Sequence, residues 1–362
     1  MLFTEWSLEI MFSERMKRLN PYVPGEQPQD RTYVKLNTNE SPYPPSPTIK
    51  DFLESFDIEK LRLYSDPLST RLRERLAEKY AVKREQVFVS NGSDEALSFC
   101  FFAFFDSAQG PLLFPEFTYS FYPVYCDFYG IAYERIPLDD QFFVDIEGFL
   151  KKVDSCGIII ANPNAPTGIC LPLSKIKDLL RNYPRENVII LDEAYIDFGG
   201  ESAVELIQDF KNLLIVMTFS KAMSLAGLRL GYTIGNKALI DALFTVKDSF
   251  NSYPVDMLSQ AIGEIAIADE AYYRKMREKI ISTRAYCKSE LEKFGFDVLP
   301  SKANFLFVKK AGIPGKEIYL KLKERGILVR HFNTKGINEF VRISIGTRAD
   351  MERLLEEVKK VF

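Results

Sequence analysis

The chain has 362 residues, 46% of them apolar, with 47 Lys and Arg against 50 Asp and Glu. This length and composition predict two domains, or one large domain with a smaller one, and exclude a disordered chain. The net charge of −3 gives no broad electrostatic reason to bind nucleic acid or an anionic membrane. With His331 as the single histidine, we expect no metal site and no histidine-based hydrolytic triad.

The five cysteines are widely spaced, odd in number and without a C-x-x-C pair. This pattern argues against a disulfide framework and a zinc ribbon, so we expect reduced thiols in a cytoplasmic protein. Acidic residues near the N-terminus replace the apolar core of a secretion signal, and the longest dense apolar stretch, 99–105, is too short to span a membrane. Whether Met1, Met11 or Met16 starts the native chain is left open.

The first segment, to about Pro47, is rich in Pro and Asn and predicts an extended arm. Apolar residues at helical spacing follow at Leu68, Leu72, Leu76 and Tyr80. Short β-rich runs then alternate with amphipathic segments, at 87–90, 157–161, 188–191 and 213–217. This alternation predicts an α/β domain with a mostly parallel sheet flanked by helices.

From about 256 to 295 the pattern is long, charged and helical, which suits a connection between two domains. The remaining segments read as strand, helix, strand, strand and helix, in the order NFLFV, KEIYLKLKERG, ILVRHF, VRISIG and ADMERLLEEVKKVF. They predict a smaller α+β domain. We therefore divide the chain into a large domain at 46–280 and a small domain made of the arm, 1–45, and residues 281–362.

Polar clusters follow several of the candidate strands. They are Asn91–Glu95, Asn162–Gly168, Leu191–Tyr195, Thr218–Lys221 and, just beyond, Leu225–Tyr232. Each cluster alone is typical of a helix cap or a turn. In open α/β sheets, however, ligands bind at the carboxyl ends of the strands, so the clusters together predict one site.

The chemistry of these clusters is complementary. The helix start at Gly92, Ser93 and Asp94 can offer backbone N–H groups and a positive dipole end to a phosphate. Asp192 can pair with a protonated ring nitrogen, Tyr195 can donate to a phenolate-like oxygen, and Lys221 can form a Schiff base. Further donors for the same phosphate are Ser220 and Arg229. A ligand that needs all of these groups is pyridoxal 5′-phosphate.

On these residues the chain resembles the fold-type I pyridoxal-phosphate aminotransferases, and among them the histidinol-phosphate aminotransferase family, with its S-K-x-x-x-L-A-G-L-R-x-G-Y signature at 220–232. The resemblance runs from PYVPGEQP to VRISIGTR, nearly the whole chain. It implies a transaminase of histidine biosynthesis. The reaction would convert L-histidinol phosphate and 2-oxoglutarate into imidazole-acetol phosphate and L-glutamate.

The resemblance also implies individual roles. Lys221 would be the Schiff-base lysine, Asp192 the pyridinium partner and Tyr195 the donor to the ring 3′-oxygen. Phe117, in Pro-Glu-Phe, matches the aromatic residue that stacks on the cofactor ring. The residues implied to hold the phosphate are Gly92, Ser93, Asp94, Ser220 and Arg229.

One position departs from the family pattern. Many relatives have an asparagine directly before Pro-Thr-Gly, where it donates to the ring 3′-oxygen, whereas this chain has Ala165. Either Asn164 or Asn162 replaces that contact, or Tyr195 makes it alone. We expect Asn164 to contact the cofactor.

The resemblance assigns substrate contacts as well. Arg342 matches a carboxylate-binding arginine, Arg330 a second arginine for the substrate phosphate, and Tyr43 a substrate-contacting tyrosine, while Asn37 belongs to the arm beside them. Tyr64 matches a tyrosine that reaches the cofactor phosphate of the neighbouring subunit, which implies a homodimer with composite active sites.

Other activities stay open at this point. A lyase or decarboxylase acting on threonine phosphate, an aromatic amino-acid transaminase and a non-catalytic cofactor-binding module are compatible with the same fold. Since neighbouring residues of a strand point to opposite faces, we expect His331 to point away from the site if Arg330 points into it.

Overall fold

The computed structural model describes residues 12–17, 19–184 and 186–362, so the first eleven residues of the predicted arm, including Met1 and Met11, lie outside the described residues. Its larger sheet consists of β2 (Val87–Ser90), β3 (Leu112–Pro115), β4 (Tyr133–Ile136), β5 (Gly157–Ala161), β6 (Ile189–Asp192), β7 (Leu213–Thr218) and β8 (Gly231–Gly235). The strand order is β2-β8-β7-β6-β5-β3-β4. Every neighbouring pair is parallel except those of β8, which runs antiparallel to β2 and β7.

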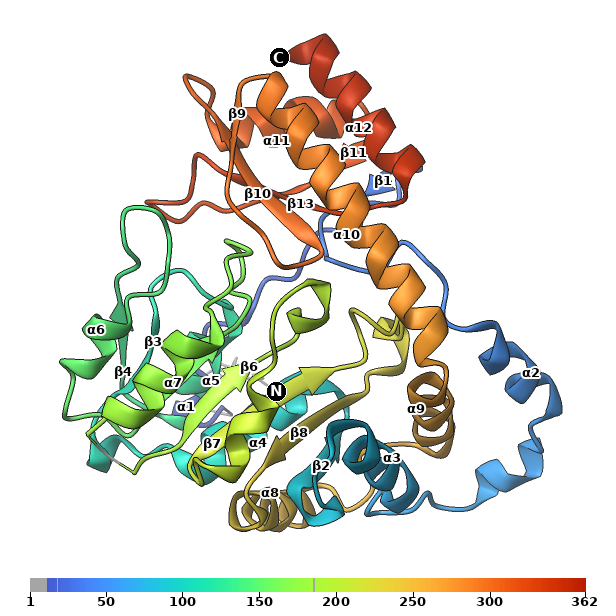
Figure 1. The fold of residues 1–362 in the computed structure, drawn as a ribbon, viewed down its shortest axis with the longest axis vertical. Helices are drawn as coiled ribbons and strands as arrows, with labels where there is room; N and C mark the ends of the chain where they lie inside the picture. Colours follow the sequence, from blue (N-terminus) through green and yellow to red (C-terminus); the bar gives the residue numbers. More distant parts are fainter. Residues whose placement is uncertain (1–11, 18, 185) are drawn as a thin grey trace, which may run out of the picture.

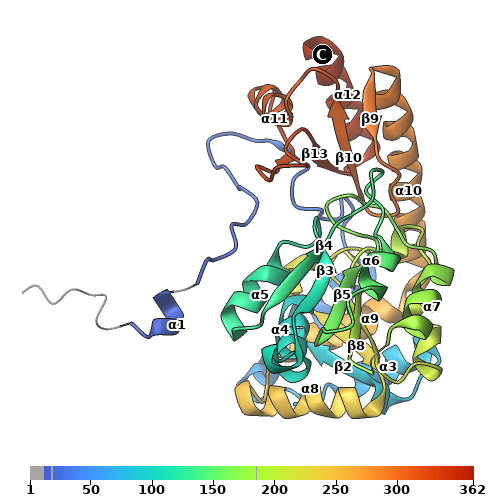
Figure 2. The same cartoon turned by 90° about the vertical axis from the view of Figure 1, so that its left-hand side faces the viewer.

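Helices cover both faces of this sheet (Figures 1 and 2). Their bounds are α2 (Pro47–Ser55), α3 (Thr70–Tyr80), α4 (Gly92–Phe104), α5 (Phe121–Tyr129), α6 (Ile146–Leu150), α7 (Leu173–Asn182), α8 (Lys237–Phe250) and α9 (Met257–Ala268). Alternate residues of a strand point into two different hydrophobic cores. Ile158 and Ile160 pack on the side of α3, α7 and α9, whereas Ile159 packs on the side of α4, α5 and α8. The strands are therefore apolar on both faces, as expected of a buried parallel sheet.

The smaller domain has a four-stranded sheet of order β12-β13-β10-β9. Its strands are β9 (Phe296–Val298), β10 (Phe305–Lys310), β12 (Arg330–His331) and β13 (Val341–Ser344), and its helices are α11 (Gly315–Glu324) and α12 (Arg348–Val361). The helix α10 (Glu270–Lys293) runs from the end of α9 to this domain (Figure 1). The domain boundary placed at 280/281 falls inside α10.

The described part of the N-terminal arm contains the short helix α1 (Glu14–Lys17), and the chain then runs along one side of the molecule to the small domain (Figure 2). Its strand β1 (Val34–Lys35) pairs in parallel with β11 (Ile327–Leu328) of the small domain. This pairing attaches the arm to the strand β11.

Two elements differ from the sequence expectation. The helical region 256–295 is two helices, because Asp269 caps the start of α10 by accepting a hydrogen bond from the Tyr272 backbone N–H. The run ILVRHF is not one strand: it divides at Val329 because β11 pairs with the arm and β12 pairs with β13.

All five cysteines are free thiols. Across 12–17, 19–184 and 186–362, we find no helix that combines the length and the apolar composition needed to cross a membrane.

Candidate active site

A pocket of about 260 Å³ lies at the carboxyl ends of β5, β6 and β7, between the large sheet and the small domain. The arm covers it, since Pro24, Gly25 and Thr38 belong to its lining. The predicted site residues that line it are Asn37, Ser93, Asp94, Asp192, Tyr195, Ser220, Lys221, Arg229, Arg330 and Arg342. Segments that are far apart in the sequence thus meet where the topology of the sheet predicts a ligand site.

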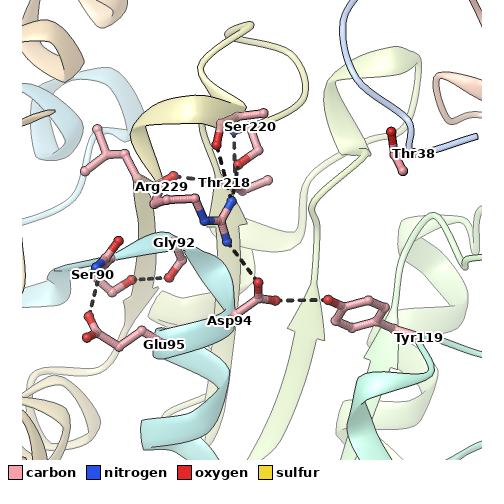
Figure 3. A network of polar contacts seen from close by, with 12 residues as sticks. Thr38, Ser90, Gly92, Asp94, Glu95, Tyr119, Thr218, Ser220 and Arg229 are labelled. Carbon is pink, nitrogen blue, oxygen red and sulfur yellow. Dashed lines mark hydrogen bonds and ion pairs between the residues drawn. The ribbon is translucent and has the colours of Figure 1, made fainter. Parts of the chain in front are cut away.

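A basic corner of the pocket forms around Arg229 (Figure 3). Its guanidinium donates to Asp94 Oδ2 at 2.9 Å and to Ser220 Oγ at 3.5 Å. Asp94 Oδ1 in turn accepts from the Tyr119 hydroxyl at 3.0 Å. The corner therefore combines a guanidinium, a serine hydroxyl and the first turn of α4, which is the set of donors that binds phosphate.

Close backbone packing shapes this corner. A Cβ at Gly231 would lie 2.4 Å from both the carbonyl carbon of Gly92 and the nitrogen of Ser93. A Cβ at Gly92, whose φ is +80°, would lie 2.8 Å from the Arg229 guanidinium. Only glycine at these two positions lets β8, α4 and the arginine approach so closely, and the resulting cradle fits a phosphate group.

Asp192 ends β6 on the floor of the pocket. Its carboxylate accepts hydrogen bonds from the Tyr122 hydroxyl at 2.9 Å and from the Ala194 backbone N–H at 3.2 Å. Burial raises the pKa of Asp192 to about 6. A buried acid of this kind is suited to a ligand that brings its own positive charge, such as a protonated ring nitrogen.

Lys221 and Tyr195 lie side by side above this floor. The Lys221 Nζ is 3.4 Å from the Thr38 carbonyl oxygen, to which it donates, and 5.7 Å from the centre of the Tyr195 ring. The Tyr195 hydroxyl accepts from Asn39 Nδ2 at 3.0 Å. The Phe305 ring packs edge-on against Tyr195 and fixes its plane.

Two arginines of the small domain face the pocket from the other side. Arg330 and Arg342 are directly opposite each other in the β12–β13 pair. Arg330 donates to the Val23 and Pro24 carbonyls of the arm at 3.2 Å, and Arg342 donates to the Asn37 carbonyl at 3.1 Å. Within the described residues, Arg342 Nε and Asn37 Oδ1 are buried and have no hydrogen-bond partner. They are therefore available to a bound ligand.

The predicted stacking of Phe117 on the cofactor ring has no support from the pocket lining. Phe117 does not belong to the pocket lining; its ring packs against Phe142 and beside Gly336. Tyr119 lines the pocket instead and is held there by its bond to Asp94. The chain between β3 and α5 is a turn, and the next aromatic residue after Phe117, two positions further on, is the one that reaches the pocket.

The expected cofactor contact of Asn164 is not supported either. Its Nδ2 donates to the Phe117 carbonyl at 2.8 Å and to Thr167 Oγ1 at 3.2 Å, and it does not belong to the pocket lining. Asn162 is bonded to the backbone of Leu171 in both directions. Both amides bond within the turn, and of the three candidates only Tyr195 lines the pocket.

Three further residues lie outside the pocket. Tyr43 packs on Lys279 of α10, with the Nζ 5.1 Å from its ring centre, and does not line the pocket, so its substrate contact stays a prediction. Tyr64 is 81% exposed and stacks on Tyr253. The His331 ring nitrogen Nε2 is 3.0 Å from the Asn338 carbonyl, on the side away from the pocket, as the strand alternation predicts.

Sequence reasoning missed several lining residues, chiefly Tyr22, Asn39, Tyr119 and Phe332. Tyr22 and Asn39 belong to the arm, where irregular backbone leaves no periodicity to read. Of the run 37–41, only Asn37 is predicted from the sequence as a site residue, although Thr38 and Asn39 line the pocket as well.

Comparison with known proteins assigns the family. Residues 31–358 match the family model for aminotransferases of class I and II. The chain is 58% identical over 356 residues to a histidinol-phosphate aminotransferase of Syntrophus aciditrophicus, covering 98% of this chain and 99% of the relative. It is 47% identical over 349 residues to a protein of the same name from Clostridium acetobutylicum, covering 96% and 98%.

Solved structures agree on the fold. A Sinorhizobium meliloti histidinol-phosphate aminotransferase in complex with pyridoxal 5′-phosphate matches with a TM-score of 0.87 and 24% identity, over 97% of this chain and 98% of that one. A Thermus thermophilus aspartate aminotransferase with maleate matches with a TM-score of 0.82 and 20% identity, over 97% and 99%. The shared fold is the fold-type I architecture of pyridoxal-phosphate enzymes. Together with the family match, this shows that the chain belongs to the class I and II aminotransferases, which use pyridoxal 5′-phosphate.

Proposed function

We propose that this protein is a histidinol-phosphate aminotransferase, which transfers the amino group between L-histidinol phosphate and 2-oxoglutarate in histidine biosynthesis. The pairing of Arg330 with Arg342 supports this most directly. Like charges directly opposite each other destabilise a sheet, so two arginines at one pocket wall suit a site that receives anions. The phosphate of one substrate and the carboxylates of the other are such anions.

The donor set suits pyridoxal 5′-phosphate. Asp192 would pair with its protonated ring nitrogen and Lys221 would hold its aldehyde, while its phosphate would bind to Ser220, Arg229 and the first turn of α4. When bound, this cofactor supplies an electron-withdrawing ring that makes the proton on the amine-bearing substrate carbon acidic.

The chain's own groups would then handle protons and charge. Lys221 is the amine beside the pocket that can accept the acidic proton as a base and return it as an acid. The Arg342 guanidinium lies between the rings of Phe305 and Phe332, 5.3 and 5.6 Å from their centres, which holds it in place for a carboxylate. The arm covers the pocket and limits the access of water to it.

A homodimer is part of the proposal. Tyr64 and Tyr253 form an exposed stacked pair, and the neighbouring Leu61, Leu63 and Phe250 are also exposed. Large apolar side chains gathered on one surface are typical of a protein interface. A second copy of the chain would cover them and receive Tyr64 at its cofactor phosphate. The free thiols favour a cytoplasmic location.

The test compares substrates and variants of the purified, cofactor-loaded protein. We expect the visible spectrum to change on addition of L-glutamate, and L-histidinol phosphate to be turned over faster than L-phenylalanine or L-tyrosine. Arg330→Ala should reduce turnover of the phosphorylated amine more than that of an unphosphorylated one. Carbon dioxide release from threonine phosphate without a response to glutamate would refute the proposal in favour of a decarboxylase. Preference for L-phenylalanine would make the protein an aromatic transaminase.

A further inference from the structure

The Tyr195 hydroxyl accepts a hydrogen bond from Asn39, a residue that the proposed reaction does not use. Asn39 is 1% exposed and has a φ of +55°, an uncommon backbone conformation for a residue other than glycine. Its side chain lies between the large domain, which carries Tyr195, and Ser344 of the small-domain strand β13. A buried residue in this conformation needs surroundings that hold it there.

Those surroundings fix the orientation of the Asn39 amide. The backbone N–H of Asn39 donates to Ser344 Oγ at 2.8 Å, and Ser344 Oγ donates its single proton to Asn39 Oδ1 at 2.9 Å. Asn304 Nδ2 donates to the Asn39 carbonyl at 3.0 Å. Since Ser344 identifies the amide oxygen, the atom that faces Tyr195 is the amide nitrogen, which can only donate.

The consequence concerns the Tyr195 proton. A phenolic proton lies close to the ring plane, on one side of the oxygen or on the other. The Asn39 N–H occupies one side, at 3.0 Å, so the hydroxyl proton of Tyr195 must point to the other side. Phe305 blocks rotation of the ring, and Tyr195 lines the pocket beside Lys221. The proton is thereby directed into the pocket.

We propose that Asn39 is a positioning residue, which makes Tyr195 an obligatory hydrogen-bond donor toward the ligand in the pocket. This inference rests on the proposed function, because the receiving atom is the ring oxygen of the cofactor. It also explains how the site manages with Ala165: Asn162 and Asn164 are bonded elsewhere, and a single donor with a fixed direction serves in place of two.

The test is a pH titration of the visible absorption band of the cofactor-loaded protein. Asn39→Asp keeps the size of the side chain and tolerates the positive φ, but its carboxylate can only accept, so it draws the Tyr195 proton away from the cofactor oxygen. Loss of that donor makes the oxygen more basic. We expect the midpoint pH of the titration to rise by about one unit, the effect of one hydrogen bond to a charged group. Asn39→Gly should shift it less, in the same direction.

A double-mutant cycle with Tyr195→Phe separates positioning from charge. If Asn39 acts through Tyr195, the shift caused by Asn39→Asp shrinks markedly when the hydroxyl is absent. Asn37→Asp is the matched control, since it adds the same charge to the same arm at an amide that bonds to Glu26 instead of Tyr195. Its shift should be equal with and without the hydroxyl.

Two results would overturn the inference. One is an unchanged midpoint in both folded Asn39 variants, and the other is an Asn39→Asp shift of the same size in the Tyr195→Phe background. Circular dichroism establishes that each variant is folded, and Asn39→Gly preserves the backbone bond to Ser344 if the aspartate variant does not fold. A wild-type protein without a glutamate-responsive absorption band would instead refute the proposed function, and the inference with it.

Discussion

Adjacent acids at the end of β6 are buried for different purposes. Asp192 faces the pocket, where a cationic ligand can neutralise it, and burial raises its pKa to about 6. Glu193 faces away and is bonded to neutral donors, the Ser202 hydroxyl at 2.5 Å and the Ala203 backbone N–H at 2.8 Å. Burial raises the pKa of Glu193 to about 8, so at neutral pH this carboxyl keeps its proton.

We expect Glu193→Gln to remove a pH dependence of stability from the cofactor-free protein. The folded state holds the Glu193 proton up to about pH 8, whereas the unfolded chain releases it near the ordinary value of 4.5. The free energy of unfolding therefore falls as the pH rises through this window, by about 1.4 kcal/mol per unit. Urea unfolding between pH 5 and 9 measures it, with the exposed Glu205→Gln as control. Parallel pH profiles for wild type and Glu193→Gln would contradict the assignment.

For individual residues, the sequence predicted which types of side chain form the site better than which position supplies each of them. Lys221, Asp192, Tyr195, Arg229 and their neighbours were found because each follows a buried strand. Phe117 and Tyr119 could not be told apart, since both follow the same strand within a few residues. Only the conformation of the turn decides which ring enters the pocket, and aromatic residues on either side satisfy the same local preferences.

Among the elements, β8 and α4 pack backbone against backbone at Gly231. There is no room for a side chain at Gly231, because the backbone of Gly92 and Ser93 occupies that space. This contact sets the position of the first turn of α4 relative to Arg229. A shift in this contact should therefore affect binding of the cofactor phosphate more than it affects the rest of the sheet.

We expect Gly231→Ala to lower the stability by roughly 1–3 kcal/mol, because the backbone must shift to admit the methyl group. The affinity for pyridoxal 5′-phosphate should fall with it. Gly227→Ala is the matched control in the same segment, since nothing lies within 4 Å of the added atom, and its effect should stay within about 0.5 kcal/mol. Thermal unfolding and fluorescence titration with the cofactor measure both quantities; equal effects of the two variants would contradict the packing argument.

An element could be predicted from the sequence when its own residues determine it, and could not when it depends on a segment far away in the chain. The strands β5, β6 and β7 are apolar on both faces and appear in the sequence as continuous apolar runs. The strand β8, with glycine at both ends, has no such pattern and was not predicted. The division of ILVRHF could not be predicted either, because it depends on the arm supplying a competing strand, β1.

On the scale of the whole molecule, one buried side chain forms hydrogen bonds to both domains. Arg284, on α10, donates to the Phe198 carbonyl of the large domain at 2.9 Å and to the Ala303 carbonyl of the small domain at 2.6 Å. Burial lowers the pKa of this guanidinium to about 10, which still leaves it charged at neutral pH.

Replacing Arg284 by Met should cost roughly 2–4 kcal/mol of stability, because it leaves two buried carbonyl groups without a donor. We also expect the unfolding transition to broaden as the small domain loosens from the large one. Lys288→Met, one turn further along α10, removes only an exposed ion pair with Glu292 and should cost less than about 1 kcal/mol. Calorimetry compares the two variants. An unfolding transition of Arg284→Met as sharp as that of the wild type would contradict the proposed role of Arg284 in joining the domains.

The proposed composite site can be tested by mixing two inactive variants. Lys221→Ala lacks the reactive amine, and Tyr64→Ala lacks the hydroxyl that the partner subunit would receive. If the sites are composite, each mixed dimer contains one site with both defects and one with neither. Activity should therefore appear when the two proteins are unfolded together and refolded. A mixture no more active than its components would contradict a shared site.

The pairing of β1 with β11 has a consequence for synthesis of the protein. It joins Val34 to Ile327, and at roughly 5–20 residues per second a ribosome makes the second of these tens of seconds after the first. Every strand of the large sheet, and Lys221 with it, precedes β11 in the chain. The large domain can thus fold while Thr38 and Asn39 still lack the strand that holds them over the pocket. During translation the pocket has no cover, and we expect the cofactor to enter most freely in that interval.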